Sequence, residues 1–290
     1  MNKNKKIFHF QHLKKKWSDK HKEIEKQIVK KHGHLIASLI PKQQIIGGVL
    51  LAAVPFMQMA PQTVQAQINN LSRQETPKIT PQNLVLKISE LLPKEVRPLI
   101  PGEEKVITDY LSEVFKIKVF PELEGIRLNR SYGLIGQEQH LKRYFGDSTD
   151  QHFDNEKERE SYSLQGIAPG LGAWGYFAKS KDEMTENEKL REKYYIAVPT
   201  FLAPGFNENV GRYGLFFKYR KMLVVNPENG KAIVTDIADA GPAEWTDKHL
   251  GGSPEVMGYL ERVDGAQKGP VLYFFIDDSN DTIPLGPISL

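Results

Sequence analysis

The chain has 290 residues, of which 40% are hydrophobic and none is cysteine. This length allows one large domain or two smaller ones, and the lack of cysteine excludes disulfides, zinc sites with cysteine ligands and cysteine nucleophiles. Residues 1–44 carry 12 Lys and 3 acidic residues; subtracting these from the totals of 39 and 36 leaves 27 basic and 33 acidic residues, a net charge of −6. Because the larger part is acidic, we expect no binding of nucleic acid.

An uncharged apolar run at residues 45–57 follows the Lys-rich segment and precedes a polar stretch that ends at Ala66. This order is typical of an export signal. An uncleaved membrane anchor through residues 45–60, with a cytoplasmic Lys-rich tail, is the alternative. We therefore expect residues 1–66 to be a tail plus export signal or anchor, and the rest to be extracytoplasmic, either secreted or membrane-anchored. The five histidines of residues 1–34 have no regular ligand spacing, so we interpret them as part of a solvated tail.

Two helices are predicted after a polar linker at residues 67–81. Thr80 followed by proline is an N-cap pattern and predicts a helix over residues 82–92. Pairs of apolar residues spaced four apart predict an amphipathic helix over residues 103–115. We interpret residues 82–160 as a small helical accessory region.

Three residues within that region have the spacing of a metal site. His140-x6-Asp147, with His152 nearby, resembles the first half of the zinc site of D-alanyl-D-alanine carboxypeptidases. Two histidines and a carboxylate leave an open coordination position for water. The Glu-x-x-His of that family is not matched, because Glu244 and His249 are five residues apart. A zinc-dependent wall peptidase is therefore the least favoured function, and we expect neither a metal nor another cofactor.

From Gly166 onward the sequence is rich in short β-type runs separated by turn-forming residues. Residues 204–214 are predicted to be a loop, and Ser253 followed by Pro254 predicts the start of a short helix. An Asn/Pro/Gly cluster between two apolar runs predicts a hairpin. The predicted strands are residues 173–178, 194–198, 222–225, 231–237 and 270–276.

Three short motifs in this part carry a family resemblance. They are Ala-Val-Pro at residues 197–199, the turn at residues 225–231 and Asp-Ala-Gly-Pro at residues 239–242. In this order they resemble the double-psi β-barrel of the rare-lipoprotein-A, expansin and membrane-bound lytic transglycosylase group, over about residues 172–276. The resemblance implies a six-stranded double-psi-like barrel in residues 166–290. With the preceding helices, the fold class is α+β.

The resemblance also implies a function at the cell wall. Such barrels bind glycan strands in an open groove, and the transglycosylases cleave peptidoglycan with a carboxyl group that acts first as an acid and then as a base. Asp239 corresponds to the family's loop Asp, and Asp236 lies three residues earlier. His249 stands where the family has a further Asp. We therefore predict Asp239 as the leading catalytic acid, assisted by His249 or Asp236.

Four further residues are predicted to bind the substrate. Trp174, Tyr176 and Trp245 could stack on sugar rings, and Glu244 is the fourth. The expected partner is peptidoglycan or another cell-wall glycan. One alternative stays open: Asp239 can instead cap its own turn. In that case the barrel is a non-catalytic glycan-binding or protein-interaction module at the cell envelope.

Overall fold

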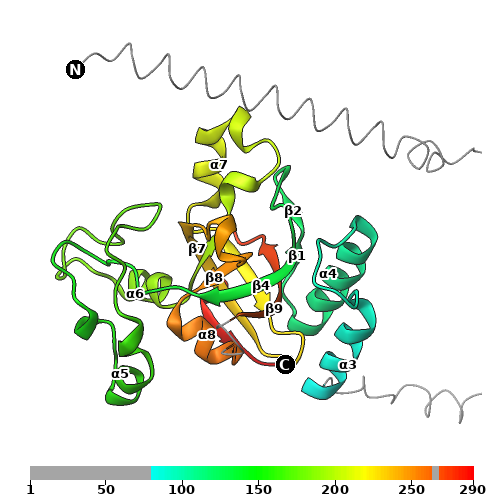
Figure 1. Ribbon diagram of the computed structural model, residues 1–290, viewed down its shortest axis with the longest axis horizontal. Coiled ribbons are helices and arrows are strands. Elements are labelled where there is room, and N and C mark those ends of the chain that lie inside the picture. Colours follow the sequence, from blue (N-terminus) through cyan, green and yellow to red (C-terminus); the bar gives the residue numbers. More distant parts are fainter. Residues whose placement is uncertain (1–79, 263–267) are drawn as a thin grey trace, which may run out of the picture. The chain divides into compact units, whose positions relative to one another are not determined.

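A computed structural model describes residues 80–262 and 268–290 (Figure 1). These residues belong to one compact unit, Ser72–Leu290. The predictions for the Lys-rich tail and the export signal or anchor concern residues 1–66, which lie outside the described residues. Within the described ranges, none of the helices is both long enough and apolar enough to cross a membrane.

Six strands close into a barrel with mixed strand directions, as predicted. In their order around the barrel they are β4 (Tyr132–Gln137), β8 (Leu250–Gly252), β5 (Tyr195–Val198), β7 (Ala232–Ala240), β6 (Lys221–Val225) and β9 (Lys268–Ile276), which returns to β4. The β4–β8 and β5–β7 pairs are parallel, and the other four are antiparallel. This barrel is compatible with a double-psi fold, and the α+β fold class is confirmed.

The remaining elements decorate the barrel. Two short strands extend its sheet, β1 (Val119–Phe120) beside β9 and β10 (Gly286–Ile288) beside β7. The strands β2 (Glu122–Leu123) and β3 (Ile126–Arg127) form a separate hairpin. The helices are α3 (Pro81–Leu91), α4 (Pro101–Phe115), α5 (Glu156–Tyr162), α6 (Glu186–Lys193), α7 (Val210–Phe217) and α8 (Pro254–Leu260). The 3-10 turns are Thr149–Gln151, Ser163–Gln165, Thr200–Leu202, Phe206–Glu208 and Glu244–Thr246.

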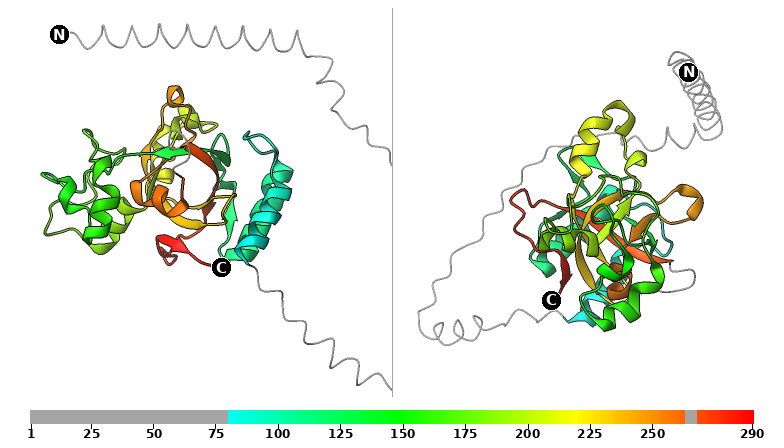
Figure 2. Two further views of the ribbon diagram at one scale, coloured as in Figure 1. Left: turned by 60° about the horizontal axis from the view of Figure 1, so that its bottom comes forward. Right: turned by 90° about the vertical axis from the view of Figure 1, so that its left-hand side faces the viewer.

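Alternation along the barrel strands divides the apolar side chains between two cores. Successive strand residues point to opposite faces, so Val224 and Ile233 belong to one buried cluster, whereas Leu223 and Val234 belong to another. The second cluster also contains the apolar faces of α3 and α4, which lie against one side of the barrel (Figure 2, left, cyan to blue-green). The helical region is therefore packed onto the barrel as a second layer.

Both predicted N-terminal helices are confirmed. The Thr80 hydroxyl accepts the N–H of Asn83 at 3.3 Å, which satisfies one of the amides that a helix start leaves free. The Glu103 carboxylate accepts the N–H of Ile100 at 3.0 Å. Four buried side chains from the two helices contribute about 1.5–3 kcal/mol each to folding by leaving water. They are Leu84, Ile88, Ile107 and Leu111.

The predicted hairpin and the helix after Ser253 are also confirmed. The Asn226 side chain accepts the N–H of Glu228 at 2.9 Å, and its backbone carbonyl accepts the N–H of Gly230 at 2.9 Å. Gly230 has a φ of +74°, a conformation that favours glycine. The Ser253 hydroxyl accepts the N–H of Val256 at 3.2 Å and so caps α8.

Two local predictions are wrong. Residues 173–178 do not form a strand; they form a tight turn in which the N–H of Gly175 donates to the carbonyl of Gly172 at 3.0 Å. The strand that residues 173–178 were predicted to supply is instead β4, which lies within residues 82–160. The predicted loop at residues 204–214 is partly helical, because α7 buries Tyr213 together with the two phenylalanines at residues 216–217.

Candidate functional site

A cleft of about 310 Å³ opens beside the end of β7. Four segments line it: residues 129–134 before and within β4, residues 199–202 after β5, residues 242–244 after β7 and residues 247–249 before β8. The cleft therefore lies where loops between barrel strands meet, a common location for binding sites. Of the predicted site residues, it brings together Glu244 and His249.

His249 is fixed by two hydrogen bonds to a single residue of β4. Its N–H donates to the Leu134 carbonyl at 2.8 Å, and its Nδ1 accepts the N–H of Leu134 at 2.9 Å. Burial lowers the pKa of His249, and the charges of Arg130 and Lys268 lower it further. The imidazole is therefore neutral at pH 7, and with Nδ1 as the acceptor its proton is on Nε2.

Charged side chains of both signs surround this imidazole. Lys248 donates to the Gln137 carbonyl at 3.0 Å and pairs with Glu138 at 2.5 Å. Within the described residues, the buried Nε of Arg130 has no hydrogen-bond partner. The carboxylates of Glu244 and Asp247 belong to exposed residues. The cleft thus offers both hydrogen-bond donors and carboxylate acceptors.

Asp239 holds a turn next to the cleft, but it does not line the cleft. Its Oδ1 accepts the N–H of Ala173 at 2.9 Å and the N–H of Ala240 at 2.8 Å. These bonds anchor the turn at residues 172–175 to the end of β7. Burial raises the pKa of Asp239, although the two backbone hydrogen bonds oppose the rise. Such a carboxyl is better suited to proton transfer than an exposed one.

Asp236 lies apart from this constellation. It is fully buried, its Oδ2 accepts from Nη1 of Arg191 at 3.0 Å, and its Oδ1 has no hydrogen-bond partner within the described residues. Burial raises its pKa to about 8. The structure therefore does not bring Asp236 and Asp239 together as an acid pair.

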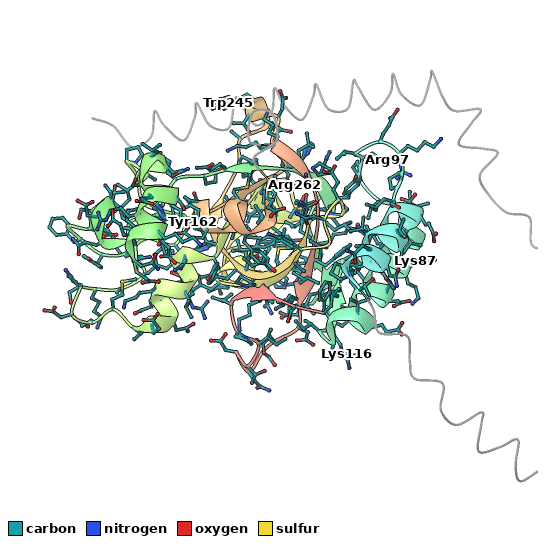
Figure 3. The ribbon with its side chains drawn as sticks, turned by 90° about the horizontal axis from the view of Figure 1, so that it is seen from below. Lys87, Arg97, Lys116, Tyr162, Trp245 and Arg262 are labelled. Carbon is teal, nitrogen blue, oxygen red and sulfur yellow. The ribbon has the colours of Figure 1, made fainter. Side chains whose placement is uncertain are left out.

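The three aromatic candidates differ in their availability to a ligand. Trp174 is half-buried, and its Nε1 donates to the Ile237 carbonyl at 3.0 Å, so it belongs mainly to the packing. Tyr176 is 37% exposed and Trp245 is 85% exposed. Trp245 belongs to the 3-10 turn whose first residue, Glu244, lines the cleft, and Figure 3 shows it at the tip of its loop. Trp245 is therefore the aromatic side chain best placed beside the cleft.

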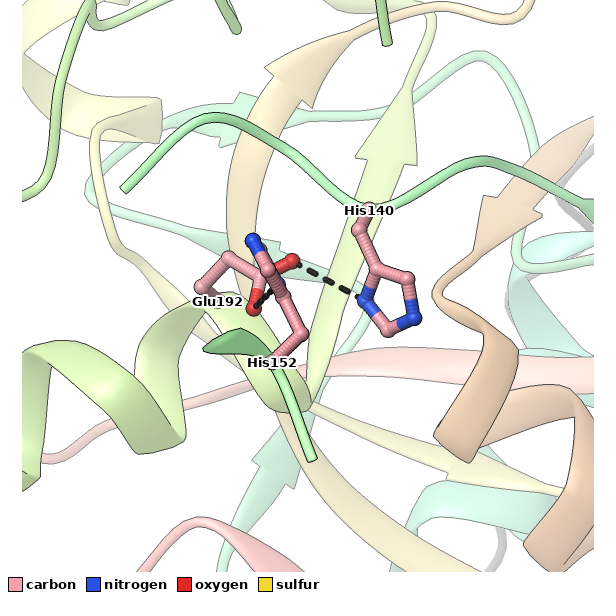
Figure 4. A group of neighbouring side chains, drawn as sticks. All are labelled: His140, His152 and Glu192. Atoms are coloured by element: carbon pink, nitrogen blue, oxygen red, sulfur yellow. Dashed lines mark hydrogen bonds and ion pairs between the residues drawn. The ribbon is translucent and has the colours of Figure 1, made fainter. Parts of the chain in front are cut away.

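The two histidines of the weakly matched metal motif come together with Glu192 in a second, buried cluster (Figure 4). His152 contacts Asp147 through Nε2 at 2.8 Å and Glu192 through Nδ1 at 3.0 Å. Nδ1 of His140 lies 3.3 Å from Glu192. Burial opposes a charge on His152, but its hydrogen bonds to the two carboxylates outweigh that effect and raise its pKa.

The sequence did not indicate four of the residues at these two sites. Arg130 and Lys248 line the cleft, whereas Glu192 and Glu255 are buried near the two histidines. Charged residues in a polar stretch are normally interpreted as exposed. In this chain only the tertiary contacts distinguish these candidate positions from ordinary surface charges.

No protein-family model, no curated protein and no solved structure matches this chain. The fold, the cleft and the chemistry of its side chains are therefore the basis for assigning a function.

Proposed function

We propose that the barrel is an extracytoplasmic module that binds cell-wall glycan in the cleft beside β7. The observation that carries the proposal is the combination of Trp245, 85% exposed, with a polar cleft lined by its sequence neighbour Glu244. An exposed indole next to a cleft offers a flat apolar face on which a ligand can stack. The flat apolar face of a sugar ring suits an indole, and the sugar hydroxyl groups suit the polar cleft.

The cleft has both hydrogen-bond donors and acceptors, and the hydroxyl groups of a sugar chain can pair with both. Nε2–H of His249 and the guanidinium of Arg130 are donors, whereas Glu244 and Asp247 are acceptors. The volume of about 310 Å³ is at the lower end of the range for small-molecule pockets. A short section of a longer strand fits this size, with the rest of the strand in solvent.

Cleavage of the glycan is the second candidate function, because burial raises the pKa of Asp239. A protonated carboxyl can give its proton to the leaving glycosidic oxygen and then, as carboxylate, take a proton from the attacking 6-hydroxyl group. Binding without cleavage is favoured over this candidate for two reasons: Asp239 does not line the cleft, and its Oδ1 is engaged by two backbone amides.

Co-sedimentation of the full-length protein with purified sacculi tests the binding proposal. We expect wild type to sediment with the sacculi and Trp245→Ala to bind about two- to tenfold more weakly, the size of a stacking contribution. Leu215→Ala is the matched control, because Leu215 is 82% exposed on α7 and does not line the cleft. Failure of wild type to sediment, or equal loss in both variants, would overturn the proposal.

Mass spectrometry of the same incubations separates binding from cleavage. We expect intact sacculi and no anhydro-muropeptides. Release of anhydro-muropeptides by wild type but not by Asp239→Asn would instead establish the second candidate. The asparagine keeps an oxygen that accepts the N–H groups of Ala173 and Ala240, so the turn is preserved and a loss of product reports on the carboxyl group itself.

A further inference from the structure

The buried cluster around His140 contains more potential ligand atoms than its hydrogen bonds use. One ligand atom from each of His140, His152 and Glu192 lies within 4.8 Å of the others, and all three side chains are fully or almost fully buried. They come from three separate segments: the loop after β4, the end of the turn at residues 149–151 and the last turn of α6. The sequence motif indicated the two histidines, and the fold adds Glu192 from a separate helix.

A fourth carboxylate completes the group. Glu255, in the first turn of α8, is 4% exposed, and its Oε2 lies 3.9 Å from Nδ1 of His140. Both of its oxygens, and Nε2 of His140, have no hydrogen-bond partner within the described residues. A buried carboxylate without a hydrogen-bond partner is strongly unfavourable. A bound cation would remove that penalty.

The separations between these atoms fit a small divalent cation. Zinc binds imidazole nitrogen and carboxylate oxygen at about 2.0–2.1 Å. In a tetrahedral site, neighbouring ligand atoms are then about 3.3 Å apart. Nδ1 of His152 lies 3.0 Å from Oε2 of Glu192, whereas Nδ1 of His140 lies 3.3 Å from Oε1 of Glu192 and 3.9 Å from Oε2 of Glu255. Separations within the group extend up to 4.8 Å, so the side chains must close slightly around a bound ion.

An outer hydrogen bond orients one of the imidazoles for this role. Asp147 contacts Nε2 of His152 at 2.8 Å. When Nε2 carries the proton and donates to this carboxylate, the lone pair of Nδ1 points at Glu192. A metal-binding histidine usually has such a carboxylate partner on its other nitrogen. The Asp147–His152 pair thus has the arrangement of a ligand and its outer-sphere support.

The side chains around the histidines carry charges of both signs. Arg143 donates to Glu192 from Nε at 2.8 Å and opposes a second positive charge. Three carboxyl groups, those of Asp147, Glu192 and Glu255, face the histidines. Burial and the charge of Glu192 raise the pKa of Glu255 to about 8, so a cation that binds there must displace a proton. Lys193, the other nearby cation, pairs with carboxylates outside the cluster, at 2.7 and 2.6 Å.

We propose that His140, His152, Glu192 and Glu255 bind one divalent cation of the zinc type, with Asp147 as the outer-sphere partner of His152. Two imidazoles and two carboxylates are a ligand set that zinc accepts. Because the ligands are buried, the site has no open position for substrate, and the cation is structural. It joins α6, α8 and the loop after β4, and is independent of glycan binding in the cleft.

Zinc titration of the full-length protein tests this site after five histidines that could bind metal adventitiously are removed. These are His9, His12, His21, His32 and His34, each replaced by asparagine. We expect one tightly bound zinc per chain, a higher melting temperature with zinc than with chelator, and the visible spectrum of tetrahedral Co²⁺ when cobalt replaces zinc. Absence of stoichiometric zinc from the folded protein would overturn the proposal.

Variants in the same background identify the ligands. Glu255→Gln is expected to weaken zinc binding at least tenfold, and Asp147→Asn by about 10–100-fold, the usual effect of losing an outer-sphere partner. Glu261→Gln is the matched control, since Glu261 is exposed at the end of the same helix, and it should bind zinc like the parent. Equal zinc affinity in all variants that fold, as judged by circular dichroism, would assign the metal to other residues.

Discussion

At the scale of single residues, Asp236 shows how burial changes the chemistry of a carboxyl group. It faces Lys221 across the β6–β7 pair, but Lys221 pairs instead with Asp278 at 2.7 Å and Asp281 at 2.6 Å. Asp236 is left with Arg191 as its one ion-pair partner within the described residues. Burial therefore dominates and raises its pKa to about 8.

This pKa predicts a specific dependence of stability on pH. In the unfolded chain Asp236 has an ordinary pKa of about 3.9. Asp236 therefore keeps its proton to a higher pH in the folded protein than in the unfolded chain. The resulting stabilisation is complete below about pH 4 and is lost as the pH rises to about 8. Relative to Asp236→Asn, wild type should lose on the order of a few kcal/mol of unfolding free energy across that range.

Urea unfolding at a series of pH values measures this difference. Asp277→Asn is a suitable control, because Asp277 is exposed near the end of β9, and its pH profile should follow that of wild type. An Asp236→Asn profile parallel to wild type would show that Asp236 is ionised in the folded state at neutral pH.

At the scale of elements, the β6–β7 hairpin depends on one backbone conformation. Gly230 has a φ of +74°, and a Cβ atom there would lie 3.3 Å from side chains of Leu84 and Val85 on α3. The turn is thus constrained by its own backbone and by the helix packed on it. The first constraint belongs to the turn itself, and the second follows from the close approach of α3 to the hairpin.

We predict that Gly230→Ala lowers the unfolding free energy by at least about 1–2 kcal/mol, the penalty for an L-residue in the left-handed region. Gly102→Ala is the matched change: Gly102 lies in the first turn of α4, and a Cβ there meets nothing within 4 Å. That variant should gain from a few tenths to about 1 kcal/mol. Chemical denaturation of both variants measures the contrast, and equal effects would contradict it.

At the scale of the whole molecule, α3 and α4 and the barrel share one core. Leu111 of α4 is fully buried in the cluster that includes Leu223 of β6 and Phe274 of β9. Because these side chains cover one outer face of the barrel, loss of the helices would expose that face to water. We therefore expect the described unit to unfold as one.

Leu111→Ala should lower the unfolding free energy by about 2–5 kcal/mol, as is usual for a cavity in a packed core. Far-ultraviolet circular dichroism and the fluorescence of Trp174, which packs against the barrel core, should report the same transition when Trp17 and Trp245 are replaced by phenylalanine. Val106→Ala, at a position 51% exposed on the same helix, should change stability by less than about 0.5 kcal/mol. Separate transitions for helix and barrel signals would instead show an independent helical unit.

The sequence by itself predicted those features that local patterns control. Thr80 and Ser253 indicated helix starts, the Asn/Gly cluster at residues 226–230 indicated the hairpin, and apolar periodicity indicated α4. These predictions succeeded because capping, turn geometry and amphipathicity act over a few residues. The failure at residues 173–178 has the same origin, since apolar residues in a glycine-rich turn have the composition of a strand.

Only the tertiary structure decided which of the predicted site residues lie at the cleft and which do not. Glu244, His249 and Trp245 belong to or adjoin the cleft, Asp239 anchors a neighbouring turn, and Asp236 is buried beside Arg191. Likewise, the buried carboxylates of the histidine cluster come from helices that the sequence indicates only as charged or capped segments. Burial and pairing depend on contacts between residues that are tens of positions apart, and those contacts exist only once the barrel has closed.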